Sequence, residues 1–213
     1  MIATKSIKET ILEELKTKAI VSIPASEADY LSVAADLPFK VEYHDSEIIT
    51  MGLATPKHEL LVSNIIWVLN NLFISNEDLL VYGSNVGVQI PKFEGGYYMP
   101  DALVVKGDLE LIAKSNCIIS NPYIIVEVLS PATSKFDTSD KFAEYKTLES
   151  LKQIIFINQH KVSVASYVRT EKPNTWLHQD CRTLEESITI ENSEVSLATI
   201  YRKIKFEGEG FNS

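Results

Sequence analysis

Two segments in the middle of the chain are apolar at almost every position. Residues 101–105 read DALVV and residues 123–129 read YIIVEVL. Strands that are apolar on both faces are typical of sheets that are covered on both sides. We therefore predict two buried strands, and each carries one carboxylate: Asp101 at the start of the first and Glu127 in the middle of the second.

A long helix is predicted upstream of these strands. Apolar residues recur at every third or fourth position between residues 61 and 72. Thr55 is a suitable N-cap, and Pro56 suits the first helical position because its missing N–H is not needed there. The pattern predicts a helix from Pro56 to about Phe73. Shorter helices are predicted over residues 5–18, 139–149 and 196–203.

Alternating polar and apolar positions predict hairpins. Residues 39–50 alternate around a turn near residues 45–46, and residues 153–168 read as a second hairpin. Further strands are predicted over residues 79–90, 175–179 and 187–190. Because helices are interspersed among strands, we predict an α/β sandwich around a central mixed sheet.

Composition and charge narrow the class of protein. A chain of 213 residues with 45% apolar residues suits one soluble globular domain with a small N-terminal appendage. The formal charge of −9 argues against nucleic-acid binding through a global positive field, although a local basic groove is compatible with it. The charged N-terminus does not read as a signal peptide, and no apolar run is long enough to span a membrane. We expect a cytoplasmic protein.

The two carboxylates are the first candidate site. Strand alternation puts Ile125, Glu127 and Leu129 on one face. A buried carboxylate loses solvation unless it is paired, protonated or bound to a metal. One interpretation is an ion pair with Arg or Lys near the sheet edge. The other is a hard cation such as Mg²⁺, which needs convergent carboxylate oxygens, and two acids on two buried strands favour it.

The motif around these acids resembles a known superfamily. M-P-Asp101, with Glu127 in an apolar strand 26 residues later, resembles the PD-(D/E)XK nucleases. The stretch EVLSP followed by DxxxKFxxY is similar to the restriction endonuclease family called Uma-two. The resemblance covers residues 38–205 and implies a restriction-endonuclease-like α/β/α sandwich with a central mixed β-sheet. Residues 1–37 would form a helical appendage, and residues 206–213 a tail.

The resemblance implies a metal site and a catalytic lysine. Asp101 and Glu127 would hold Mg²⁺ or Mn²⁺. The superfamily pattern places a lysine two residues after the second acid, where this chain has Leu129. Lys141 is the candidate replacement, with Tyr145 on the same helical face at i+4. A solvated helix lysine is the alternative interpretation of Lys141.

Two further polar residues match family positions. Glu47 corresponds to the acid of an N-terminal "GE" segment, with Ser46 in place of glycine, and would be a further metal ligand. Glu42 is the alternative acid nearby. His58 matches the histidine at the start of the first long helix, where a neutral imidazole would accept a proton or bind phosphate.

Other polar residues near the motif leave two interpretations open. Ser130, Thr133 and Asp137 suit turn and capping roles after the strand, and Asp137 also suits a role in orienting Lys141. Tyr97 and Tyr98 suit either packing or stacking on nucleotides.

The function predicted from this resemblance is a metal-dependent DNA endonuclease that acts as a homodimer, with each subunit cutting one strand. A catalytically inactive nuclease fold that binds DNA or protein is the alternative, and a metal-dependent hydrolase acting on another substrate is a third. The chain has no GxSxG, Walker or GxGxxG motif, so neither nucleophile-elbow catalysis nor a nucleotide cofactor is indicated.

Overall fold

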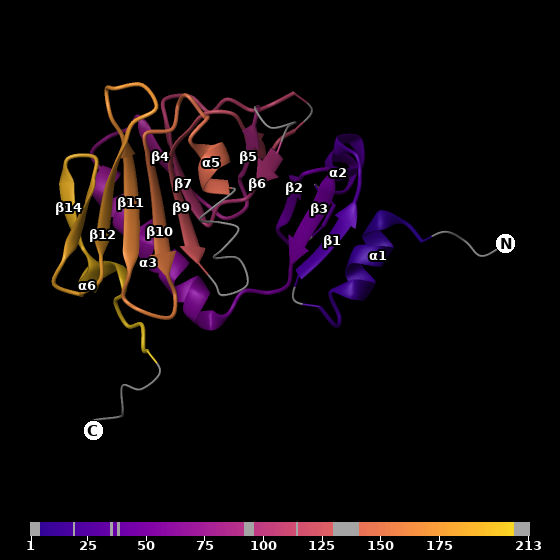
Figure 1. The fold of residues 1–213 in the computed structure, drawn as a ribbon, viewed down its shortest axis with the longest axis horizontal. Coiled ribbons are helices and arrows are strands. Elements are labelled where there is room, and N and C mark those ends of the chain that lie inside the picture. The colour runs from indigo at the N-terminus through magenta and orange to yellow at the C-terminus, as the bar shows by residue number, and fades with distance from the viewer. Residues whose placement is uncertain are drawn as a thin grey trace.

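The computed structural model describes residues 5–18, 20–34, 36–37, 39–91, 96–113, 115–129 and 141–206. Within these residues the strands form two six-stranded sheets and a two-stranded hairpin (Figure 1). The helices are α1 (Ile7–Glu14), α2 (Glu27–Ala34), α3 (Pro56–Phe73), α5 (Phe142–Tyr145) and α6 (Leu197–Ile200).

The N-terminal sheet has the strand order β1-β3-β2-β6-β5-β8. Its strands are β1 (Ile20–Pro24), β2 (Val41–His44), β3 (Glu47–Met51), β5 (Gly87–Ile90), β6 (Gly96–Tyr98) and β8 (Ile118–Ile119). Neighbouring strands pair antiparallel except β5 and β8, which pair parallel. Strand β1 comes from the segment expected to be a separate appendage, and it extends this sheet at the edge next to β3.

The central sheet has the order β12-β11-β10-β9-β7-β4. Its strands are β4 (Leu79–Gly83), β7 (Ala102–Lys106), β9 (Pro122–Leu129), β10 (Gln153–Asn158), β11 (Val164–Arg169) and β12 (Trp176–Cys181). Strands β9 and β10 are parallel and the other neighbours are antiparallel, so the predicted mixed sheet is confirmed. The segment 79–90, predicted as one or two strands, forms two, β4 in this sheet and β5 in the N-terminal sheet.

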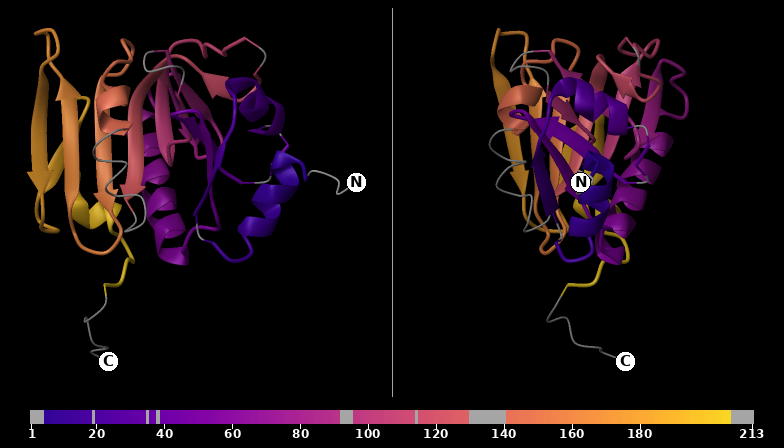
Figure 2. Two further views of the ribbon diagram at one scale, coloured as in Figure 1. Left: turned by 45° about the vertical axis from the view of Figure 1, so that its right-hand side comes forward. Right: turned by 90° about the vertical axis from the view of Figure 1, so that its right-hand side faces the viewer.

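The central sheet is covered on both faces, as its doubly apolar strands predict. One face, with Val104 and Val126, packs against α3, α6 and the hairpin of β13 (Ser187–Ile190) and β14 (Ser193–Ser196). The other face, with Leu103 and Ile125, packs against residues of β5, β6 and α5. Figures 1 and 2 show α3 and α5 on opposite sides of this sheet.

Helix α3 is confirmed with the predicted limits. The Thr55 side chain accepts a hydrogen bond of 3.2 Å from the His58 backbone N–H, and Pro56 occupies the first turn. The apolar stripe of the helix is buried against the central sheet. Because these signals are local, the start of the helix and the position of His58 follow directly from the sequence.

The hairpin of β2 and β3 is also confirmed. Both turn residues, Asp45 and Ser46, adopt left-handed backbone conformations, with φ of 48° and 61°. Two successive positive φ values are typical of the type I′ turns that join two antiparallel strands.

Helix α5 is shorter than predicted. It covers Phe142–Tyr145, whereas residues 139–149 were expected to be helical, and residues 130–140 lie outside the described part of the chain. After α5 the guanidinium of Arg169 binds the carbonyl oxygens of Lys146 at 3.0 Å and Leu148 at 2.6 Å. Arg169 of β11 therefore holds the chain that follows α5. Among the described helices, none is long and apolar enough to cross a membrane.

Candidate functional site

The two predicted acids lie opposite each other on neighbouring strands. Ala102 of β7 pairs with Val126 of β9 in an antiparallel ladder, and one further step along each strand brings Asp101 opposite Glu127. Directly opposed residues of antiparallel strands project from the same face of a sheet. Asp101 and Glu127 are only 4% and 5% exposed. The register therefore creates a buried pair of carboxylates.

Asp101 is held by three groups from different parts of the chain. Its Oδ1 forms an ion pair with Lys40, which directly precedes β2, and lies 3.2 Å from Nε2 of His58 in the first turn of α3. Its Oδ2 accepts a 2.8 Å hydrogen bond from the backbone N–H of Val128. Asp101 thus joins the N-terminal sheet, α3 and β9.

These contacts decide the charge of Asp101. Burial alone would raise the pKa of its carboxyl, but the hydrogen bond from His58 and the positive charge of Lys40 outweigh burial. The net effect holds the pKa of Asp101 below its usual range. The carboxyl is therefore ionised at neutral pH.

Glu127 lies against the two residues that bracket α5. The hydroxyl of Tyr145 donates a 2.8 Å hydrogen bond to Oε1 of Glu127. Nζ of Lys141, the N-cap residue of α5, lies 3.7 Å from the same oxygen. Lys141 and Tyr145 are four positions apart, so one turn of helix presents both to the acid.

Lys141 also binds a third acid, Glu42 of β2. Its Nζ lies 2.9 Å from Oε1 of Glu42, and the same oxygen accepts a 2.9 Å hydrogen bond from the backbone N–H of Met99. Lys141 is 3% exposed and Glu42 is 1% exposed. The interpretation of Lys141 as a solvated lysine is therefore wrong, because its amine is buried between carboxylates.

Glu47 lies outside the group formed by Asp101, Glu127, Lys141 and Glu42. Its position therefore does not support the expectation that it is a metal ligand. Its side chain accepts a hydrogen bond from the Ser22 hydroxyl of β1. Strand β2 pairs directly with β6, and the chain after β6 leads to Asp101. Strand β3 is separated from β6 by β2, so Glu47 on β3 is one strand too far away to join the acids. Glu42, the alternative acid, comes from the strand that pairs with β6 and takes the inner position.

The two tyrosines before Asp101 pack in the core and do not offer rings for stacking on nucleotides. Tyr97 and Tyr98 are 2% and 0% exposed. The Tyr98 hydroxyl donates to Oε2 of Glu144 at 2.8 Å and lies 2.7 Å from Nδ1 of His44. Burial, followed by the hydrogen bond to Glu144, raises the pKa of Tyr98. The three residues Ser130, Thr133 and Asp137 lie outside the described residues.

Sequence reasoning did not single out Lys40, nor His44 and Glu144 as partners of Tyr98. Lys40 stands at the start of a predicted hairpin, where a lysine is ordinarily solvated, and its partner lies 61 positions away. Nothing local marks such a residue. Glu144 carried only the weak signal that it adjoins Tyr145, and its burial is a finding of the structure.

The side chains present suit a hard divalent cation. In the described part of the chain, no three His, Cys, Asp or Glu side chains already form a metal-binding group. Asp101 and Glu127 nevertheless bring two buried carboxylates to opposed positions of neighbouring strands. Mg²⁺ is often held by one or two carboxylates, with waters and substrate phosphates completing its octahedral shell. The donor set fits an ion of this kind, and Asp101 and Glu127 are the residues that would hold it.

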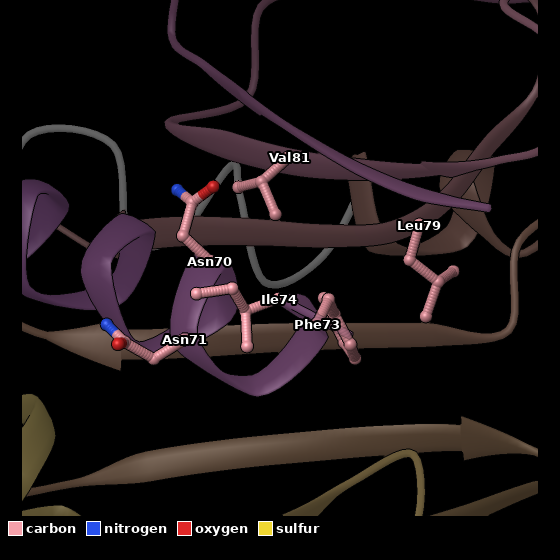
Figure 3. A pocket seen from close by; sticks show the side chains of 6 residues that line it. All are labelled: Asn70, Asn71, Phe73, Ile74, Leu79 and Val81. Carbon is pink, nitrogen blue, oxygen red and sulfur yellow. The ribbon is translucent and has the colours of Figure 1, made fainter. Parts of the chain in front are cut away.

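A separate hollow of about 240 Å³ lies at the other end of α3 (Figure 3). It is lined by side chains of α3, of the residue after it and of β4, namely Asn70, Asn71, Phe73, Ile74, Leu79 and Val81. Helical rise separates His58 from Asn71 by roughly 20 Å. The lining has no titratable side chain, so this hollow has no part in the chemistry of the acids.

Comparison with known proteins places the chain among relatives of similar sequence. Its residues 28–199 match the Uma2 family, described as "Putative restriction endonuclease". Two proteins of Synechocystis sp. (strain ATCC 27184 / PCC 6803 / Kazusa) are similar. Uncharacterized protein sll1609 is 29% identical over 140 residues, which is 66% of this chain and 78% of the relative. Uncharacterized protein slr1290 is 27% identical over 138 residues, which is 65% of this chain and 70% of the relative.

A solved structure shares the fold. The crystal structure of a putative nuclease belonging to DUF820 from Anabaena variabilis ATCC 29413 superposes with a TM-score of 0.62 at 15% identity, covering 80% of this chain and 96% of that chain. At this identity the likeness concerns the fold. Since the family model spans most of the chain, including both acids, Lys141 and His58, the protein belongs to the Uma2 family of putative restriction endonucleases and has their restriction-endonuclease-like fold.

Proposed function

We propose that the protein is a DNA endonuclease that hydrolyses phosphodiester bonds with a divalent cation, Mg²⁺ or Mn²⁺, held by Asp101 and Glu127. The observation that carries the proposal is the buried pair of carboxylates on opposed strands, with the amine of Lys141 3.7 Å from one of them. Membership of the Uma2 family supports it, as does the shared fold with a protein described as a putative nuclease. We place this activity in the cytoplasm, where the proposed substrate is found.

Lys141 takes the role that a lysine at position 129 would have. Leu129 is buried among apolar side chains, so that position offers no charge. Lys141 instead brings a cation to Glu127 from the start of α5. In a site shielded from water, a fixed cation stabilises the negative charge that develops on the phosphate during cleavage. Glu42 positions Lys141, because it binds the amine and is itself fixed by the N–H of Met99.

Lys40 and His58 prepare Asp101 for its role as a ligand. Both contact Oδ1 and keep the carboxyl ionised. When bound, a divalent ion would polarise the phosphate and lower the pKa of an attacking water. Tyr145 orients the second ligand by donating a hydrogen bond to Oε1 of Glu127. In this proposal His58 also accepts a proton from the reacting groups.

Cleavage of supercoiled plasmid and of duplex oligonucleotides tests the proposal. The native protein is compared with Asp101→Asn and Lys141→Met in the presence of Mg²⁺ or Mn²⁺. We expect the native protein to cut and both variants to lose at least 100-fold in rate, a typical loss when one charge-stabilising group is removed. Glu47→Gln is the control. It neutralises an acid on β3, the strand that forms a hairpin with the β2 strand of Glu42, but it lies outside the group of Asp101, Glu127, Lys141 and Glu42. This variant should cut like the native protein.

Two outcomes would overturn the proposal. One is a native protein that cuts neither substrate at any metal concentration. The other is cleavage by Asp101→Asn at the native rate, which would point to a contaminating nuclease. Titration with Mn²⁺ measured by calorimetry provides an independent readout: the native protein should bind the ion and Asp101→Asn should bind it more weakly.

A binding module without catalysis is the second candidate function. Leu129 favours it, because the residue pattern lacks the usual lysine. In that case the native protein binds DNA without cutting it.

We further propose a homodimer in which each subunit cuts one strand. Sedimentation analysis tests this arrangement, and a monomeric mass together with double-strand breaks made in a single binding event would contradict it.

A further inference from the structure

Three segments meet at the end of the central sheet where the acids lie. They are the start of α3 (residues 55–59), the turn between β10 and β11 (residues 159–163) and the chain after α6 (residues 201–206). Figure 1 and the left view of Figure 2 show these segments at the lower edge of the sheet. We call these three segments the basic rim, for the reason given below.

Hydrogen bonds tie the turn between β10 and β11 to the site and to α3. The backbone N–H of Gln159 donates to the carbonyl of Leu129, the last residue of β9, at 3.4 Å. The Gln159 side chain accepts a 3.2 Å hydrogen bond from the hydroxyl of Thr55, the N-cap of α3. Asn158, the last residue before the turn, pairs with Leu129, which is two positions beyond Glu127, so the turn begins directly past the site.

The chain after α6 is fixed to the same place. The hydroxyl of Tyr201 donates to the carbonyl oxygens of Asn158 and Ser163, both at 2.8 Å, and so bridges the two ends of the turn. The side-chain amide of Asn64 on α3 donates to the carbonyl oxygens of Ile200 at 2.9 Å and Arg202 at 2.8 Å. Hydrogen bonds thus join the turn to the start of α3 and to the chain after α6, and they join that chain to α3 further along the helix.

The charge of these segments is opposite to that of the whole chain. They contain five Lys or Arg residues and a single acid, Glu59, whereas the chain as a whole carries −9. The basic residues are Lys57, Lys161, Arg202, Lys203 and Lys205. All are exposed except Lys57, which is half-buried and lies with Nζ 5.8 Å from the ring centre of Phe206.

The rim presents its charges from an ordered backbone. Oδ1 of Asn158 accepts hydrogen bonds from the backbone N–H groups of His160 at 2.8 Å and Lys161 at 3.2 Å. The position of the Lys161 backbone is therefore set by the turn, while its amine is in water. Less conformational entropy is lost when such a lysine binds a ligand than when a loop must be ordered first.

We propose that the basic rim binds the phosphate backbone of duplex DNA beside the bond to be cut. The proposal rests on the proposed function and specifies how the substrate is held. The acids of the site repel phosphate, and the net charge of −9 repels DNA as a whole. At physiological ionic strength charges act over only about 8 Å, so a local group of cations can bind a polyanion on an acidic protein. Phosphate contacts of this kind fix position without reading sequence.

Binding of a labelled duplex oligonucleotide, measured by fluorescence anisotropy in EDTA so that no cutting occurs, tests the rim. Lys161→Ala combined with Lys203→Ala should reduce the slope of log affinity against log salt concentration by about two, because each phosphate contact contributes about 0.9 to that slope. Lys172→Ala is the matched control. Lys161 and Lys172 are exposed lysines in the turns at opposite ends of β11, and only the first lies beside the site.

The control should bind like the native protein. An unchanged slope in the double variant, an equal loss in Lys172→Ala, or no binding by the native protein at low salt would overturn the rim. If the double variant unfolds at a lower temperature than the native protein, Lys161→Ala alone is used, and its slope should fall by about one.

The nuclease proposal fails separately from the rim. If the native protein binds DNA through the rim yet cuts with neither metal, the rim proposal stands and the nuclease proposal fails. If the native protein cuts DNA, but the rim variants bind DNA as tightly as the native protein and with the same salt dependence, the rim proposal fails and the nuclease proposal stands.

Discussion

Replacing Lys141 with methionine tests whether its amine holds buried carboxylates. Methionine keeps much of the length of the side chain and removes the charge. In the native protein the amine lies 2.9 Å from Glu42 and 3.7 Å from Glu127, and all three side chains are nearly inaccessible to water. Without it, two carboxylates stay buried close together and lose this cation.

The expected loss follows from this burial. Removing one partner from a buried ion pair costs about 3–5 kcal/mol, because the charge that remains is buried without compensation. We expect a loss of about 3 kcal/mol at pH 8, at the lower end of this range. The reason is that Glu42 keeps its hydrogen bond from the N–H of Met99 and Glu127 keeps that from Tyr145.

Urea denaturation followed by circular dichroism measures this loss at pH 8. Adding Glu42→Gln to Lys141→Met should restore part of the stability, since it removes one of the two negative charges and the glutamine oxygen still accepts from the Met99 N–H. A loss below about 1 kcal/mol, or a double variant no more stable than Lys141→Met, refutes the reasoning.

Three further predictions concern the residues around this group. The pKa of Asp101 is lowered from the ordinary carboxyl value of 3.8, so its ionised form stabilises the fold above about pH 4 and this stability is lost as the pH falls. In urea denaturation between pH 6 and pH 2, the free energy of unfolding of Asp101→Asn should therefore fall less steeply with acid than that of the native protein. Tyr145→Phe removes the hydroxyl that donates to buried Glu127 and should cost about 1–3 kcal/mol, measured in the same assay at pH 7. Thr55→Ala removes the cap of α3 and should cost about 1 kcal/mol, whereas an unchanged midpoint would show that the cap contributes nothing.

Elements with local signals could be predicted from the sequence. Thr55 and Pro56 mark the start of α3 because a helix needs a cap and tolerates proline only in its first turn. The turn at Asp45 and Ser46 follows from the alternation on either side of it. The acidic pair was found because the strands around Asp101 and Glu127 are apolar on both faces, which requires that any charge there has partners.

Features that depend on strand order could not be predicted. Glu42 and Glu47 lie on adjacent strands of one hairpin, and only the pairing of β2 with β6 decides which acid reaches Lys141. Helix α5 ends at Tyr145, and the chain after it is held by Arg169 of β11, which lies 23 positions away from Lys146. Such contacts depend on tertiary structure and leave no periodic pattern in the sequence.

The hydrogen bond from the Val128 N–H to Asp101 has a consequence for the evolution of this family. Asp101 satisfies a backbone donor and neutralises Lys40, so folding alone selects for it. Substitution at this position would therefore destabilise an inactive relative as well as an active one. The Pro-Asp motif on its own accordingly does not separate the two, and cleavage has to be measured.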